Sequence, residues 1–244
     1  PPLRHPFAAL SFAISHGFSA ASMERTLEAR AAVGALVDSD EPRAALASLV
    51  AFLPGFFNVP PIDRDEARFA QATKQMIESG DFIDIRFQDT TRYKKPVGIY
   101  WLQVAVVETA SSLGLPRAQL RIWLYRIPSL IGAIGAVLLT YWAALAFVTR
   151  RGAALAALMM CSCVLLGAEA RLAKTDAMLL LTVVAAMGAM ARVYLSWQRG
   201  EDPARPPWST PAIFWTALAG GILLKGPLIL MFVVGKLRSG SSSS

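Results

Sequence analysis

Long apolar runs without charge constrain the fold of this chain more than any other feature of its sequence. These runs are residues 44–62, 127–148, 152–168, 177–191 (extendable past Arg192 to residue 197) and 211–235 (which contains Lys225). A helix of about 20 apolar residues is long enough to cross a bilayer. The composition, 55% hydrophobic and 17% charged, argues against a soluble domain. We therefore predict an all-α, polytopic membrane protein with about five transmembrane helices.

The two ends of the chain differ from this predicted membrane unit. Residues 1–43 combine a short apolar piece with a modest amphipathic helix, and the sequence leaves their relation to the folded unit open. Residues 236–244 end in glycine and serine, a low-complexity pattern typical of a linker or an artefact. We expect the membrane unit over residues 44–235, and we expect the chain to be an incomplete copy of a longer membrane protein.

The charge balance fits a membrane location. Lys and Arg number 24 against 17 Asp and Glu, which gives a net charge of +7. In a membrane protein such an excess serves cytoplasmic loops and anionic membrane lipids. The sequence contains no basic helix interleaved with stacking aromatic residues, so we expect no nucleic-acid partner. Cys161 and Cys163 point about 200° apart on a helix and can neither form a disulfide together nor share a metal ion.

The most polar part of the membrane unit is residues 61–126, which we predict to be one long extracytoplasmic loop. It begins with three carboxylates and continues as an amphipathic helix over residues 66–79, whose apolar residues recur at helical spacing. Gly80 is placed to end this helix, because glycine adopts the left-handed conformation cheaply. A short extended run, a cationic turn and a very apolar helix over residues 97–113 follow.

The helix over residues 97–113 decides the topology, because every later span inverts if this helix crosses the membrane. The short loops 149–151 and 198–210 carry arginine, and the positive-inside rule places both in the cytoplasm only if 97–113 does not cross. Tyr100 and Trp101 at headgroup level would suit an interfacial helix. We therefore predict a juxtamembrane helix here, and one extracytoplasmic face that carries polar residues from four distant segments: Asp65, Lys95, Asp176 and Lys225.

The acidic cluster allows a structural and a chemical interpretation. Asp63 as the N-cap, with Glu66 three residues later, would form a capping box and would explain both residues without a function. It explains Asp65 less well, because one cap is enough. A carboxylate at the membrane surface beside a cationic turn is suited to accept a proton from a hydroxyl group. Both interpretations of Asp65 stay open.

The cationic turn also has two interpretations. Arg92, Lys94 and Lys95 could be a solvated charge run. They also precede a helix at headgroup depth, where charged side chains bind a lipid phosphate through strong hydrogen bonds. Pro96 is favourable in the first turn of that helix and would direct the turn.

Two further charges border apolar runs. Asp176 could simply cap the helix that follows it, and Lys225 could extend its amine toward the interface. Charges in or beside membrane spans are nevertheless costly and often functional. Gly226 and Pro227 should break the helix directly after Lys225 and free backbone groups there.

Five segments, in this order, resemble the N-terminal half of the bacterial polyprenyl-phosphate-dependent GT-C glycosyltransferases. They are DRDEARFAQATKQMIESGDFIDIRF (63–87), RYKKPVGIYWL (92–102), RIPSLIGAIGAVLLTYW (126–142), EARLAKTDAMLLLTV (169–183) and GILLKGP (221–227). That group includes the aminoarabinose transferases that act on lipid A and, more distantly, the protein O-mannosyltransferases. The resemblance covers roughly residues 48–233 and is specific in order and spacing.

The resemblance implies a multi-pass bacterial inner-membrane enzyme whose first extracytoplasmic loop holds two juxtamembrane helices and whose site faces the periplasm. It implies inverting transfer of a hexosyl or pentosyl group from a polyprenyl-phosphate-sugar donor to a lipid, glycan or protein acceptor. Carried over by motif, the residues expected to be catalytic are Asp65, Glu66 and Asp176. Those expected to bind the donor phosphate are Arg92, Tyr93, Lys95 and Lys225.

The chain departs from the aminoarabinose transferases at one position. Those enzymes have an acidic residue, implicated in metal binding, directly before the Lys-Pro pair, whereas this chain has Lys94. A divalent metal cofactor is therefore left open. Two other functions remain: a transporter or flippase for a lipid-linked anion, which needs polar residues near mid-membrane that these spans almost lack, and a non-catalytic membrane scaffold.

Overall fold

The computed structural model describes residues 42–91, 95–198 and 208–233. The described part is mostly helical, as predicted. Its helices are α3 (Pro42–Phe52), α4 (Arg64–Ser79), α5 (Gly98–Ser112), the 3-10 helix η1 (Ala118–Leu120), α6 (Ile122–Ala144), α7 (Arg150–Cys161), α8 (Val164–Glu169), α9 (Asp176–Gln198) and α10 (Ser209–Lys225). A small antiparallel hairpin, β1 (Arg86–Phe87) with β2 (Thr90–Thr91), replaces the predicted extended run.

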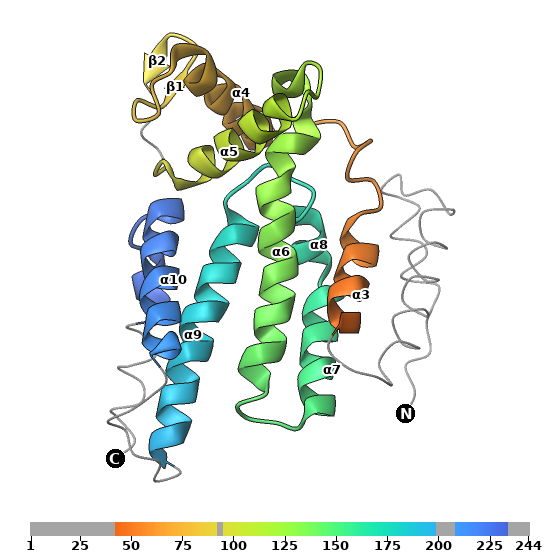
Figure 1. Cartoon of the computed structure of the whole chain (residues 1–244), viewed down its shortest axis with the longest axis vertical. Helices are drawn as coiled ribbons and strands as arrows, with labels where there is room; N and C mark the ends of the chain where they lie inside the picture. The colour runs from red at the N-terminus through yellow and green to blue at the C-terminus, as the bar shows by residue number, and fades with distance from the viewer. Residues whose placement is uncertain (1–41, 92–94, 199–207, 234–244) are drawn as a thin grey trace.

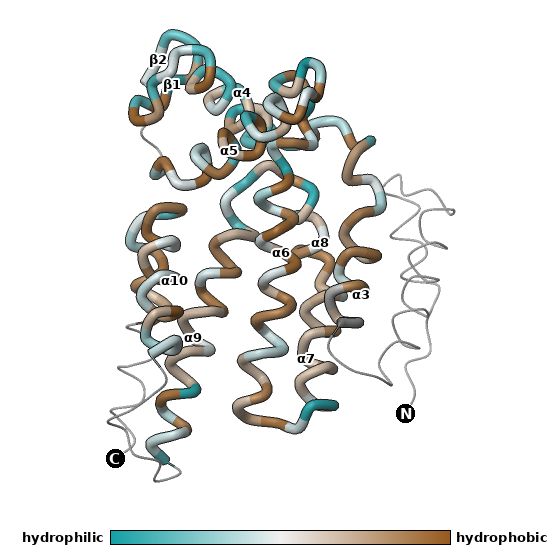
Figure 2. The backbone as a smooth tube through the Cα atoms, in the orientation of Figure 1, coloured by the Kyte–Doolittle hydropathy of each residue, from teal (hydrophilic) through white to brown (hydrophobic). Residues whose placement is uncertain are grey.

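The helices form a bundle with a polar cover at one end. Figure 1 shows α3, α6, α7, α9 and α10 along the long axis of the molecule, with α4, α5 and the hairpin across one end of this bundle. Figure 2 shows that the bundle helices are largely hydrophobic, whereas hydrophilic residues gather at their ends and on α4. Because α5 lies across the bundle end, it has the arrangement expected of a juxtamembrane helix.

The predicted spans correspond unequally to the observed helices. Among the described residues, α6 and α9 have the length and hydropathy to cross a membrane, as expected for 127–148 and 177–197. The predicted span 152–168 is two helices, α7 and α8, with a break after Cys161. The predicted span 44–62 is wrong as one helix: α3 ends at Phe52 and a turn follows. Pro54, which cannot continue the hydrogen-bonding pattern, and Gly55, with φ of 80°, explain this early end.

The last predicted span, 211–235, breaks where the sequence indicated. α10 ends at Lys225, and Gly226 has φ of 69° while its N–H donates to the carbonyl of Ile222. Helical residues resume at 228–233. Lys225 therefore lies at the end of a helix rather than in the middle of a span.

Close contact between α6 and α9 depends on a glycine. A Cβ atom at Gly132 would lie 2.7 Å from the backbone nitrogen of Met178, closer than such atoms approach in proteins. Any larger residue would therefore push α6 away from the first turn of α9, which begins at Asp176. Small residues at this crossing let two apolar helices touch along their backbones.

The helices α4 and α5 pack face to face. α4 begins after the N-cap Asp63 and ends at Gly80 in the left-handed conformation, as predicted. Its apolar side contributes Phe69, whose ring lies 5.5 Å from that of Tyr100 on α5. Tyr100 is fully buried in this contact. Trp101, the next residue, is exposed and donates a hydrogen bond to the carbonyl of Phe82.

Candidate functional site

Asp176 and Lys225 meet at the covered end of the bundle. Asp176 is the first residue of α9, Lys225 is the last residue of α10, and their side chains form an ion pair. Both side chains remain partly exposed, Asp176 to 42% and Lys225 to 24%. The pair therefore combines two predicted site residues and leaves each accessible to a ligand.

The turn that contains Lys95 lies against the same end of α10. Gly98, three residues after Lys95, packs so closely that an added Cβ would lie 2.6 Å from the carbonyl oxygen of Leu223. Leu224 shares a buried cluster with Ile99 of α5. The first turn of α5 is thus fixed beside the last turn of α10, and Lys95 is half-buried just before it. Arg92 and Tyr93, the other expected phosphate ligands, lie outside the described residues, as does Lys94.

Asp65 lies at the exposed beginning of α4. Its backbone N–H donates to the Asp63 carboxylate across 2.7 Å, which fixes the first turn of the helix. Its own side chain is 55% exposed and lies 3.4 Å from the guanidinium of Arg68. Asp63, in turn, forms an ion pair with Lys174. Asp65 is therefore held by its backbone, while its carboxylate faces the surroundings.

Glu66 lies in a different environment from its neighbour. Its side chain is fully buried and pairs with Arg126, also fully buried, through bonds of 2.6 and 3.2 Å. The Arg126 guanidinium donates its remaining hydrogen bonds to the carbonyls of Phe56, Val59 and Pro60. Its five N–H donors are thus all used. The capping-box interpretation of Glu66 is wrong, because its carboxylate turns inward and not back to the helix start.

The segment between α8 and α9 connects these groups. The backbone N–H of Ala173 donates to Glu66 across 3.2 Å, and the carbonyl of Lys174 accepts a bond from the Ser129 hydroxyl across 2.9 Å. Asp176 follows two residues later. The start of α9 is therefore fixed to both α4 and α6, and the relative positions of Asp65 and Asp176 follow from these bonds.

The charges of this region influence one another. The hydrogen bond from Lys174 lowers the pKa of Asp63 below its usual value of 3.8. Burial alone would lower the pKa of Lys174, but its bond to Asp63 and the charges of Glu169 and Asp176 raise it overall. Burial raises the pKa of Glu169 above 4.5, and a buried oxygen of this carboxyl has no hydrogen-bond partner among the described residues.

A metal site is not formed by the described side chains. Over residues 42–91, 95–198 and 208–233, no three His, Cys, Asp or Glu side chains converge in a way that could hold a metal ion. The donors present in this part of the chain do not fit a divalent metal, and we assign no step to one.

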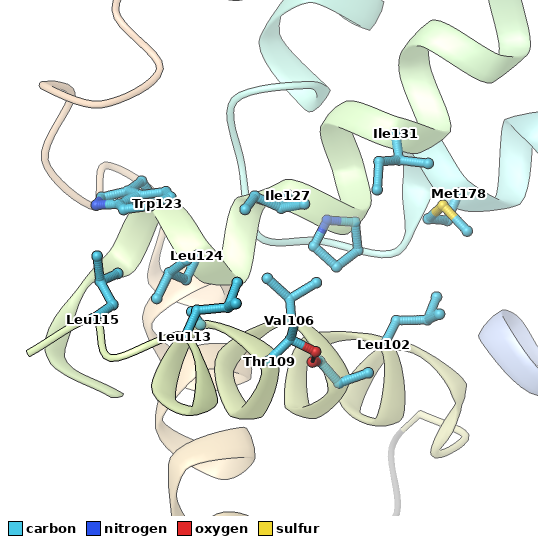
Figure 3. Close-up of a pocket in the computed structure, with 13 residues that line it drawn as sticks. Leu102, Val106, Thr109, Leu113, Leu115, Trp123, Leu124, Ile127, Ile131 and Met178 are labelled. Carbon is cyan, nitrogen blue, oxygen red and sulfur yellow. Dashed lines mark hydrogen bonds between the residues drawn. The ribbon is translucent and has the colours of Figure 1, made fainter. Parts of the chain in front are cut away.

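An apolar cavity of about 570 Å³ lies between α5 and α6. Figure 3 shows Leu102 and Met178 toward one end of it and Leu115 and Trp123 toward the other. Its lining is apolar apart from the hydroxyl of Thr109. Met178, which lines the cavity, packs against the buried cluster that contains Leu224, so one end of the cavity lies near the end of α10. A hydrocarbon chain fits such a lining.

Sequence reasoning missed the role of Arg126 and underestimated Lys174. Arg126 is the single charge within the apolar helix α6, among residues 122–144, and this isolation was the available signal. Lys174 lies in the polar segment between the apolar runs 152–168 and 177–191 and is not among the site residues expected from the sequence. Its pairing with Asp63, 111 residues away in sequence, has no local signature.

Comparison with known proteins decides the family. Residues 46–238 match the family described as dolichyl-phosphate-mannose-protein mannosyltransferase. The chain belongs to this mannosyltransferase family. The match includes the acidic cluster, the Lys95 turn, Asp176 and Lys225.

One relative of this chain is an undecaprenyl phosphate-alpha-4-amino-4-deoxy-L-arabinose arabinosyl transferase from Erwinia tasmaniensis. The two are 29% identical over 131 residues, which is 50% of this chain and 21% of the relative. The crystal structures of ArnT from Cupriavidus metallidurans share the fold. The apo state has a TM-score of 0.65 and the state bound to undecaprenyl phosphate 0.60, each at 21% identity over 80% of this chain. The chain spans about a fifth of the curated relative and 35% of the solved chains.

Proposed function

We propose that this chain is part of an integral membrane glycosyltransferase that moves a sugar from a polyprenyl-phosphate donor to a lipid, glycan or protein acceptor on the extracytoplasmic face. The observation that carries the proposal is the Asp176–Lys225 ion pair, which lies beside the Lys95 turn at the start of α5, the helix that also lines the apolar cavity. Cations at the start of α5 and an apolar cavity along the same helix suit a ligand that joins a phosphate to a hydrocarbon chain.

The names of the relatives support a donor of this class. The family description names dolichyl-phosphate-mannose, and the curated relative is named for aminoarabinose on undecaprenyl phosphate. The two names share a sugar joined to a polyprenyl phosphate and differ in the sugar. We therefore propose the polyprenyl-phosphate-sugar class and either a hexosyl or a pentosyl group.

Asp65 is the proposed general base. Its exposed carboxylate accepts the proton of the acceptor hydroxyl, whose oxygen attacks the anomeric carbon of the donor sugar. The bond from that carbon to the phosphate oxygen breaks, and the bonding electrons leave with the polyprenyl phosphate. Attack from the face opposite the leaving phosphate inverts the anomeric carbon.

Lys95 and Lys225 are the proposed cations for the departing phosphate. Negative charge grows on its oxygen as the bond breaks, and fixed cations stabilise that charge more than they stabilise the bound donor. Asp176 orients the amine of Lys225 through their ion pair. Arg92 and Tyr93 complete the proposed phosphate ligands.

Glu66 takes a positioning role in this proposal. It is fully buried and bonded to Arg126, so its carboxylate has no open path to a ligand in the described part of the chain. Its bonds hold the start of α4, and with it Asp65, against α6 and the segment before α9.

A transfer assay tests the proposal. The purified full-length protein, reconstituted in lipid, is incubated with a labelled sugar on undecaprenyl phosphate and with lipid and protein acceptors. We expect label in an acceptor with the wild type, and loss of transfer with Asp65→Asn while membrane insertion is intact. Glu78→Gln, an exposed carboxylate at the far end of α4, serves as the control and should transfer normally. Normal transfer by Asp65→Asn would exclude Asp65 as the base, and movement of the whole donor across the bilayer would favour a flippase.

A further inference from the structure

We propose that Lys174 is a positioning residue that holds Asp65 in register with Asp176. This inference rests on the proposed function, because it concerns the distance between two acids of the same site. Lys174 lies in the segment between α8 and α9, and it is not one of the site residues expected from the sequence.

The first contact joins Lys174 to the cap of α4. Its amine pairs with one oxygen of the Asp63 carboxylate, while the other oxygen accepts the backbone N–H of Asp65 across 2.7 Å. One oxygen of Asp63 therefore binds the Lys174 side chain, and the other binds the backbone of Asp65. A displacement of the Asp63 side chain moves the backbone of Asp65 directly, since one carboxylate carries both bonds.

The second contact fixes Lys174 itself. Its carbonyl accepts a hydrogen bond from Ser129 of α6 across 2.9 Å, and its N–H lies 3.3 Å from the same hydroxyl. Asp176 starts α9 only two residues later and pairs with Lys225. One short segment thus carries the amine that orients the Asp65 helix and the carboxylate that orients Lys225.

The environment of the pair distinguishes it from an ordinary surface ion pair. Exposed pairs stabilise a protein by little, because water screens them and the long side chains lose freedom. The Lys174 side chain is only 17% exposed, and it joins segments 111 residues apart. Lys74 and Glu78 on α4 form a local pair at 3.5 Å that spans a single helical turn, and they provide a matched control.

Kinetics of the full-length enzyme test the inference. Lys174→Met should lower kcat for transfer about 10- to 100-fold, which is the loss of rate expected when a catalytic group is misplaced. It should change KM for the donor less than about twofold. Asp63→Asn keeps an N-cap acceptor but loses the charge, and should lower kcat by a similar factor. The double variant should be no slower than either single variant, because the two residues act through one contact. Lys174→Arg should recover most of kcat, and Lys74→Met should be unchanged.

Several outcomes would overturn the inference. An unchanged kcat in Lys174→Met, or losses that multiply in the double variant, would show that Lys174 does not act through Asp63. If Lys174→Met fails to fold in detergent, Asp63→Asn carries the test, and normal kcat in that variant contradicts the inference. Transfer by the wild type together with full activity in Lys174→Met would overturn this inference alone. Absence of transfer by the wild type would overturn it together with the proposed function.

Discussion

Asp176 at the start of α9 and Lys225 at the end of α10 form an ion pair across 49 residues of sequence. Each could have served its own helix, Asp176 as an N-terminal acid and Lys225 as a C-terminal cation. Their pairing instead brings two helix ends together below α5, next to the Lys95 turn. The proposed chemistry depends on this convergence.

Replacement of Lys225 tests the proposed contact with the donor phosphate. Lys225→Met should raise KM for the donor about 10- to 100-fold, because a charge-assisted hydrogen bond contributes about 1.5–3 kcal/mol. Lys225→Arg keeps the charge and should be affected less. Steady-state transfer with increasing donor concentration measures both. Arg151→Met, at the opposite end of the bundle, is the control, and an equal KM in Lys225→Met and the wild type would exclude the contact.

The buried pair between Glu66 and Arg126 should stabilise the fold. Removal of one partner leaves a buried charge without compensation, so Arg126→Met or Glu66→Gln should lower the free energy of unfolding by about 3–5 kcal/mol. The same change should follow for both variants, because each breaks the same pair. Denaturant unfolding in mixed micelles measures it. A loss below about 1 kcal/mol would contradict this role.

Glu169 predicts a pH dependence of stability. Burial raises its pKa in the folded protein above 4.5, so the stability it contributes is present below that value and is lost as the pH rises through the raised pKa. Glu169→Gln stays neutral and should avoid this loss. We expect its unfolding temperature to exceed that of the wild type by about a few degrees at pH 8 and to match it at pH 4. Glu78→Gln is the control. Equal unfolding temperatures of Glu169→Gln and the wild type at pH 8 would show that burial of the Glu169 carboxylate does not lower the stability.

The cavity between α5 and α6 predicts that a change in its lining alters the KM of long-chain donors and not that of short-chain donors. Ala105 lines the cavity, and Ala105→Phe would displace part of a bound chain. Each methylene group that loses its apolar contact costs about 0.8 kcal/mol, so KM should rise about tenfold for a long-chain donor. A donor too short to reach the cavity should be unaffected. Val164→Phe, at a highly exposed position on α8, is the control. Equal effects on both donors would exclude the cavity as the chain site.

Local patterns were sufficient to predict α4 with both of its caps, α5, α6, α9 and the end of α10 at Lys225. The convergence of Asp176 with Lys225 follows from connectivity, since α9 and α10 are consecutive helices and the start of one lies at the same end of the bundle as the end of the other. These predictions succeed because capping and apolar length depend on residues close in sequence.

The buried contacts could not be predicted in the same way. Glu66 and Arg126 are 60 residues apart, and Glu66 stood at the position of a capping-box residue, so a local explanation competed with the correct one. Tyr100 on α5 faces α4, and no periodicity in so apolar a segment distinguishes that face. The apolar run 44–62 predicted one span, whereas α3 ends at Phe52, just before Pro54 and Gly55.

The most direct test of the account is to determine on which side of the membrane the site lies. Single cysteines are placed at the exposed positions Asp89→Cys in the hairpin and Arg151→Cys at the start of α7, with Cys161 and Cys163 replaced by serine. A membrane-impermeant thiol reagent is then applied to intact cells of the full-length variants. We predict labelling at position 89 without permeabilisation and at position 151 only after it. Labelling of position 151 in intact cells, with position 89 protected, would contradict an extracytoplasmic site.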